Sequence, residues 1–174
     1  MASRPRALRR KAPSDVSSPD HAAPTPDAPG GPVLFAYDGS ELAELAIEQA
    51  GQELAPGRDA LIVCVWQTGD VGFVPPSGRH LDAAAAGEVR KAAEETAAHG
   101  ASLAEKAGFQ TQSMAVEAAP TWMGIIEVAD KHGASLIVLG SHRRRGLVGH
   151  LLGSVAAAVA AHSTSSVLIV HQPS

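Results

Sequence analysis

Five short runs of strand-forming residues recur along the chain, and segments with helical periodicity separate them. Four of these runs are apolar at nearly every position, as expected of strands that are buried on both faces. Parallel sheets covered by helices on both sides contain strands of this kind. The pattern therefore predicts an α/β fold, with strands expected at 33–37, 60–66, 111–117, 135–139 and 166–170.

Four helices are expected between these strands. The first follows Ser40, a residue suited to cap it, and the second runs from about 82 to 107 after a long exposed loop at 67–80. Within the second helix, Gly87 and Gly100 should each cost about 1 kcal/mol relative to alanine. The third helix begins with Pro120 and ends at Gly133. The inner face of the fourth is expected to carry Leu151, Leu152, Val155 and Val159.

Length and composition predict one folded domain over residues 32–171. A chain of 174 residues with 45% hydrophobic content can bury one sizeable core. Residues 1–31 hold six of the twelve prolines, few large apolar side chains and a basic start. Such a segment buries too little surface to offset its ordering entropy, so a disordered tail is expected there.

Charge and cysteine content exclude several function classes. A formal net charge of −4 argues against a general nucleic-acid binder, whose affinity comes from clustered Lys and Arg. No apolar stretch is long enough to span a bilayer, and none follows the basic N-terminus as in a secretory signal, so we expect a cytoplasmic protein with no membrane partner. Cys64 is the lone cysteine and lies in an apolar run, which favours a small buried hydrophobe.

The stretch 139–154, LGSHRRRGLVGHLLGS, directly follows the clearest strand and raises the functional question. Its four glycines relax the backbone, its serines bring hydroxyls, and a helix begins close by, which are the features of a phosphate-binding loop. It lacks the Gly-Lys-Ser/Thr of a P-loop. Taken alone, three arginines in a row are more often a solvated loop than a ligand site.

Several motifs of this sequence resemble those of the universal stress protein family. The family's nucleotide motif, G-x2-G-x9-G-[S/T], matches the spacing of Gly140, position 143, Gly153 and Ser154. Asp38-Gly39-Ser40 after the first strand, the segment 133–141 and the last strand also look like family landmarks. The resemblance covers roughly residues 32–171.

This resemblance implies a Rossmann-like, five-stranded parallel sheet of order 3-2-1-4-5 of the adenine nucleotide alpha hydrolase type, with helices on both faces. It also implies ATP, with Mg²⁺ as a companion ion, between the first and fourth strand ends, and a homodimer through the last strand. Asp38 would accept hydrogen bonds from the ribose hydroxyls, and Val65 would face the adenine. The other implied contacts are Ala36 and Tyr37 at the adenosine, Leu139, Gly140, His142 and Arg143 near the phosphates, and Gly153, Ser154, Val155 and Ala156 as donors to phosphate oxygens.

One departure from the motif leaves two outcomes open. Position 143 is arginine where the motif has glycine, and Arg145 also occupies a place often filled by a small residue. If the glycine is needed for positive φ or for close backbone approach, Arg143 obstructs the phosphates. If the backbone tolerates the side chain, its guanidinium can clamp them in bidentate fashion.

Three functions are compatible with this pattern. The first is a regulatory protein that binds ATP or a related adenine nucleotide and signals stress or energy status as a dimer. The second is a dimeric interaction module of the same family that has lost nucleotide binding through Arg143. The third is an enzyme. No base, nucleophile or metal-ligand cluster stands out in the sequence, so slow ATP hydrolysis is the most activity that we expect.

Overall fold

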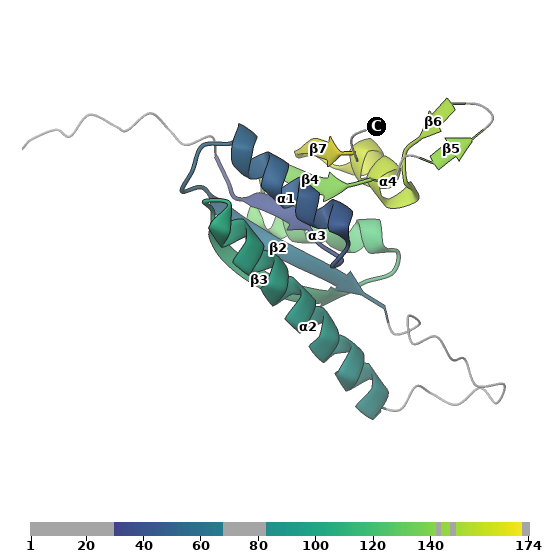
Figure 1. The fold of residues 1–174 in the computed structure, drawn as a ribbon. Coiled ribbons are helices and arrows are strands. Elements are labelled where there is room, and N and C mark those ends of the chain that lie inside the picture. The colour runs from purple at the N-terminus through teal and green to yellow at the C-terminus, as the bar shows by residue number, and fades with distance from the viewer. Residues whose placement is uncertain (1–29, 68–82, 142–143, 147–148, 172–174) are drawn as a thin grey trace, which may run out of the picture.

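The computed structural model describes residues 30–67, 83–141, 144–146 and 149–171, with the backbone alone for 83–85, 144–146 and 149–151. Its centre is a five-stranded sheet of order β3-β2-β1-β4-β7, in which all four strand pairings are parallel (Figure 1). The predicted fold class and strand order are therefore confirmed. The strands of this sheet are β1 (Val33–Ala36), β2 (Asp59–Trp66), β3 (Gln110–Glu117), β4 (Leu136–Gly140) and β7 (Ser166–Val170).

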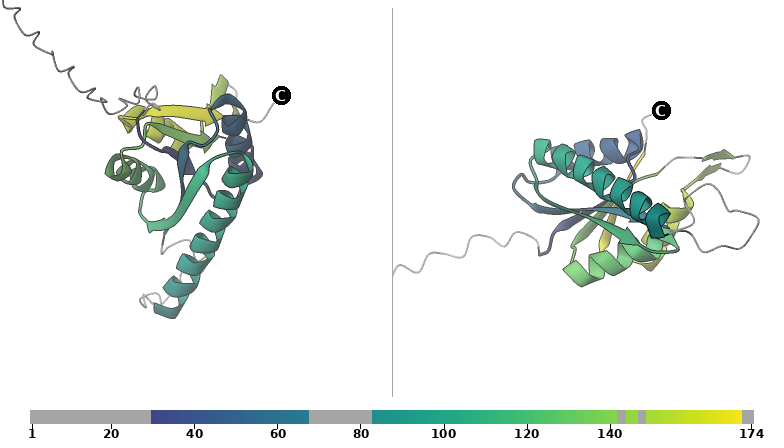
Figure 2. Two further views of the ribbon diagram at one scale, coloured as in Figure 1. Left: turned by 90° about the vertical axis from the view of Figure 1, so that its left-hand side faces the viewer. Right: turned by 90° about the horizontal axis from the view of Figure 1, so that it is seen from below.

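Helices cover both faces of the sheet (Figure 2). On one face, α1 (Glu41–Glu53) and α2 (Ala83–Lys106) pack over a core that contains Phe35 and Ile62. On the other face, α3 (Thr121–His132) and α4 (Ser154–His162) pack over Leu34 and Ile137. Successive residues of a strand point to opposite faces, so each central strand supplies apolar side chains to both cores. This is why the strands are continuous apolar runs.

Glycines in α2 have different structural roles. The exposed Gly87 has open space where a Cβ would lie. At the buried Gly100, a Cβ would lie 2.7 Å from the Tyr37 ring and 2.9 Å from a methyl group of Ile62. The sequence assigned both glycines the same cost in helix propensity. At Gly100 that cost is offset by the close approach of α2 to the sheet.

The segment between β4 and α4 differs from the sequence-based prediction. Backbone pairing forms a small antiparallel hairpin of β5 (Arg144–Gly146) and β6 (Gly149–Leu151), which was not predicted. Leu151, expected on a helix, is the last residue of β6, and Leu152 also precedes α4. Apolar residues in a short strand and in a helical turn are hard to distinguish by periodicity, and this caused the error.

Other predicted element boundaries agree closely with the structure. Gly133 ends α3, as predicted, and it adopts the left-handed conformation at φ 62°. Pro120 is the N-cap of α3, one residue before the position expected for it. Of the tail expected over 1–31, all but Gly30 and Gly31 lies outside the described residues, as does nearly all of the loop expected at 67–80. Among the described helices, none combines the length and apolar character needed to cross a membrane.

Candidate functional site

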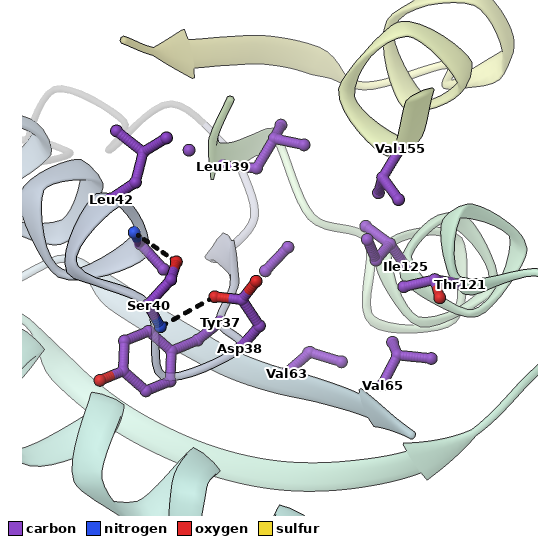
Figure 3. Close-up of a pocket in the computed structure, with 13 residues that line it drawn as sticks. Tyr37, Asp38, Ser40, Leu42, Val63, Val65, Thr121, Ile125, Leu139 and Val155 are labelled. Carbon is purple, nitrogen blue, oxygen red and sulfur yellow. Dashed lines mark hydrogen bonds between the residues drawn. The ribbon is translucent and has the colours of Figure 1, made fainter. Parts of the chain in front are cut away.

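A pocket opens at the carboxyl ends of β1 and β4, where the chain connections diverge to opposite sides of the sheet (Figure 3). Ligands of open α/β sheets bind at this type of position. The pocket is lined by Ala36, Tyr37, Asp38, Ser40, Leu42, Ala43, Val63, Val65, Thr121, Ile125, Leu139, Gly140 and Val155. Helices α1, α3 and α4 and strands β1, β2 and β4 all contribute to its walls.

On one side of the pocket, the turn after β1 holds an exposed carboxylate. Gly39 has φ 79°, a conformation that favours glycine, and it turns the chain from β1 into α1. The backbone N–H of Ser40 donates to Asp38 Oδ1 at 3.0 Å, and Ser40 Oγ accepts from the N–H of Ala43 at 3.2 Å. The serine thus caps α1, as predicted, while its N–H orients the carboxylate of Asp38 beside the pocket (Figure 3).

The opposite side of the pocket is an apolar wall. Val63 and Val65 come from β2, Ile125 from α3 and Val155 from α4 (Figure 3). The absence of a side chain at Gly124 lets α3 lie close to this wall, because a Cβ there would be 2.6 Å from the Cβ of Ala118 and 3.3 Å from a methyl group of Val65. The apolar surface suits a flat, weakly polar group such as a nucleobase.

Thr121 adds a polar group to the rim of this wall. Its Oγ1 accepts a hydrogen bond from Gln67 Nε2 at 3.0 Å, which joins the start of α3 to the end of β2. A hydroxyl that accepts in this way can still donate its own proton. Thr121 was not predicted as a site residue, because a threonine in a first helical turn carries no particular signal in the sequence.

The side chain of Tyr37 points away from the pocket (Figure 3). The ring is 2% exposed and belongs to the core under α1 and α2. Its hydroxyl donates to Glu44 Oε1 at 3.3 Å and lies 2.8 Å from His99 Nδ1. Burial, together with the negative charge of Glu44, raises the pKa of Tyr37 from 10.0 to about 12. Any contact of Tyr37 with a ligand in the pocket must therefore come from its backbone.

Tyr37 is the chain's one tyrosine, so its ionisation can be followed without interference. We expect tyrosinate absorbance to appear with a midpoint near pH 12 in the folded protein and near 10 in denaturant. Because the folded-state pKa is raised, this group stabilises the fold below pH 10, and its contribution is lost as the pH rises to about 12. Glu44→Gln should lower the midpoint without returning it to 10, since burial is the larger cause. A folded-state midpoint at the denatured value would contradict this assignment.

Ser141 connects the pocket to the last strand. It is 4% exposed, and its Oγ accepts the backbone N–H of Gly153 at 2.9 Å. Its own N–H donates to the carbonyl of Val170 at 2.9 Å, and its carbonyl lies 2.9 Å from His171 Nδ1. One residue thus fixes the ends of β4 and β7 and the entrance to α4.

The start of α4 supplies backbone donors next to the pocket. The first helical bond recorded there runs from the N–H of Ala157 to the carbonyl of Gly153. The N–H groups of Ser154, Val155 and Ala156 therefore lie in the first turn, where they have no acceptor within the helix. Such groups attract anions. Gly153 differs from its expected role as a donor, because its N–H is already bonded to Ser141.

The structure brings most of the predicted site residues together. The pocket lining includes seven of them: Ala36, Tyr37, Asp38, Val65, Leu139, Gly140 and Val155. Gly153, Ser154 and Ala156 lie at the adjacent start of α4, with the Ala156 side chain buried in the core. His142 and Arg143 lie outside the described residues. Lining residues that the sequence did not indicate are Ser40, Leu42, Ala43, Val63, Thr121 and Ile125.

Comparison with protein families identifies the type of domain. The model of the universal stress protein family matches residues 31–171. The chain belongs to this family. A universal stress protein of Mycolicibacterium smegmatis is 37% identical over 147 residues, covering 80% of this chain and 45% of its own length. Universal stress protein YxiE of Bacillus subtilis is 32% identical over 148 residues, covering 79% of this chain and 97% of its own length.

The chain thus spans about half the length of the mycobacterial relatives that it matches, with 45–48% of those proteins covered. Solved universal stress proteins share its fold. One from Archaeoglobus fulgidus superposes with a TM-score of 0.60 at 23% identity, covering 81% of this chain and 98% of that one. Another, solved in complex with cAMP, has a TM-score of 0.58 at 26% identity and covers 82% and 98% of the two chains.

Proposed function

We propose that this universal stress protein domain binds an adenine nucleotide in the pocket between β1 and β4. The observation that carries the proposal is the arrangement of three surfaces around one opening. The Asp38 carboxylate lies on one side, the apolar wall of Val63, Val65 and Ile125 on another, and the first turn of α4 adjoins the opening. A base, a sugar and a phosphate need surfaces of these three kinds. The family member solved with cAMP supports the choice of an adenine nucleotide.

In this proposal, each part of the nucleotide has its own partners. Adenine lies against Val65 and the other apolar side chains of the wall. The Asp38 carboxylate accepts hydrogen bonds from the ribose hydroxyls, using the lone pairs that are not engaged by the N–H of Ser40. The N–H groups of Ser154, Val155 and Ala156 donate to phosphate oxygens, strengthened by the helix dipole. Gly153 holds its backbone against Ser141 and thereby fixes the start of that helix.

The finer proposal is that the ligand is ATP and that Mg²⁺ accompanies it. Within the described ranges, no group of three or more His, Cys, Asp and Glu side chains could hold a metal ion. Magnesium is commonly bound through substrate phosphates while it keeps several waters. The ion would therefore arrive with the triphosphate.

The remaining part of the proposal is regulation as a homodimer through β7. This strand lies at an edge of the sheet, as predicted for 166–170, and Val167, Leu168 and Ile169 are only partly buried. An apolar edge strand favours pairing with another strand. Since Ser141 bonds to both β7 and the entrance of α4, a nucleotide at α4 would stabilise the edge that forms the dimer.

Calorimetric titration of the purified chain with ATP, ADP, AMP and cAMP tests this function. We expect ATP to bind with a Kd below about 1 mM, and mass spectrometry of freshly purified protein to detect an adenine nucleotide. Sedimentation velocity on the same samples should show a dimer whose population rises with ATP. If no nucleotide binds and a dimer still forms, the chain is instead an interaction module.

A further inference from the structure

A second groove, separate from the nucleotide pocket, lies where α1 meets the end of α2. Its lining consists of Glu41, Glu44, Leu45, Ile47, Glu48, Leu103, Lys106 and Ala107. The groove therefore combines an apolar surface with three carboxylates and one ammonium group. It shares no lining residue with the pocket between β1 and β4.

The charged residues of α1 are all acidic. The helix contains Glu41, Glu44, Glu48 and Glu53 and no basic residue. The helix dipole favours Glu41 and Glu44 in the first turn and disfavours Glu53 in the last turn. Like charges three or four positions apart also repel each other. In α2, by contrast, Arg90 pairs with Glu94 and Lys91 with Glu95. With Glu41, Glu44 and Glu48 against Lys106, the groove lining carries an excess of negative charge, which favours a cationic occupant.

The N-terminal segment of the same chain has the complementary chemistry. Residues 4–11 read RPRALRRK, which gives five basic residues and one large apolar residue, Leu8, and the first acid in the sequence is Asp15. Arginine stems can cover apolar surface while their guanidinium groups face carboxylates. The segment therefore matches both the apolar surface of the groove and its acidic rim.

The connecting chain is long enough for this contact. Residues 12–29 separate the basic segment from the described chain. A random coil of this length spans roughly 21–25 Å root-mean-square, and an extended chain of this length spans at most about 60 Å. Helix α1, at about 1.5 Å per residue, is only about 20 Å long. The chain enters the fold at the end of the sheet where α1 ends (Figure 1). Tethering raises the effective concentration, so even a weak contact would be populated.

We propose that residues 4–11 dock in the groove between α1 and α2, with the arginines facing Glu41 and Glu48 and Leu8 lying against Leu45 and Leu103. This contact places the basic segment on the face of α1 next to Glu44, the partner of the Tyr37 hydroxyl. It is independent of nucleotide binding, because none of these groove residues lines the nucleotide pocket.

Paramagnetic relaxation measurements on the full chain test the proposal. A nitroxide is attached at Ser3→Cys in a Cys64→Ala background, which leaves a single reactive thiol. We expect loss of amide signal intensity at residues 41–48 and 103–107 in about 10 mM salt, and recovery in about 1 M salt, where the Debye length falls to about 3 Å. Broadening that is uniform over the surface would overturn the proposal.

Two acid-to-amide variants identify the groove as the docking site. Glu41→Gln with Glu48→Gln should abolish the localised broadening, whereas Glu94→Gln with Glu95→Gln, an equal change of charge on α2, should leave it intact. Circular dichroism would verify that both variants are folded. Equal effects in the two variants would contradict the proposal. So would broadening between spin-labelled chains and separate isotope-labelled chains, because the occupant would then be a second copy.

Discussion

Replacing Gly140 with valine is expected to lower the free energy of unfolding by about 3 kcal/mol and to abolish nucleotide binding. A Cβ at this position would lie 2.7 Å from the carbonyl oxygen of Leu42 and 2.9 Å from its carbonyl carbon. These are backbone atoms of α1, so α1 would have to move away from β4 to relieve the overlap. That movement would also displace the Asp38 turn from the opposite wall of the pocket.

Chemical denaturation and nucleotide titration measure the two effects of Gly140→Val. The matched control is Gly30→Val, because a Cβ at Gly30 meets nothing within 4 Å. We expect that control to change the unfolding free energy by less than about 0.5 kcal/mol. A Gly140→Val protein as stable as this control would show that α1 and β4 do not pack as closely as the structure indicates.

Replacing Asp38 with alanine is expected to weaken ATP binding by about 10- to 100-fold, since hydrogen bonds to charged groups contribute about 1.5–3 kcal/mol. The loss arises from the ribose contact that we propose. Asp38→Asn is the sharper variant, because its amide oxygen can still accept from the N–H of Ser40 while the charge is removed. Most of the affinity should be lost in this variant although the turn is retained.

Calorimetric titration with ATP measures the Kd of both Asp38 variants, with Asp59→Ala as the control. Asp59 is another exposed aspartate, and it lies at the opposite end of the sheet, at the start of β2. Its removal should leave the Kd unchanged. If wild-type protein binds ATP and neither Asp38 variant weakens it, the sugar lies elsewhere and the proposed orientation of the nucleotide is wrong.

The sequence indicated the elements of this fold because burial on both faces leaves a local signature. Continuous apolar runs identified the strands, and the range 166–170 agrees with β7 at both ends. The end of α3 at Gly133 could also be predicted from the sequence, because helices often end at a residue in the left-handed conformation, which strongly favours glycine. Asp38, Val65, Gly140 and Val155 were placed near one another through the family resemblance, and the structure does bring them to one pocket.

What the sequence could not provide are contacts between residues distant in the chain. From the sequence, Gly100 only lowers the helix propensity of its segment. Its packing against Tyr37 depends on how α2 lies on the sheet. Thr121 becomes part of the pocket rim only because α3 begins beside the end of β2.

The sequence by itself determined which segments form strands and helices, because the burial of each segment sets its local hydrophobic period. Only the tertiary structure decided which atoms are available for chemistry. The N–H of Gly153 is bonded to Ser141 and the ring of Tyr37 is turned into the core, while Asp38 remains exposed beside the apolar wall. These outcomes depend on distances between separate elements, and such distances leave no periodic pattern in the chain.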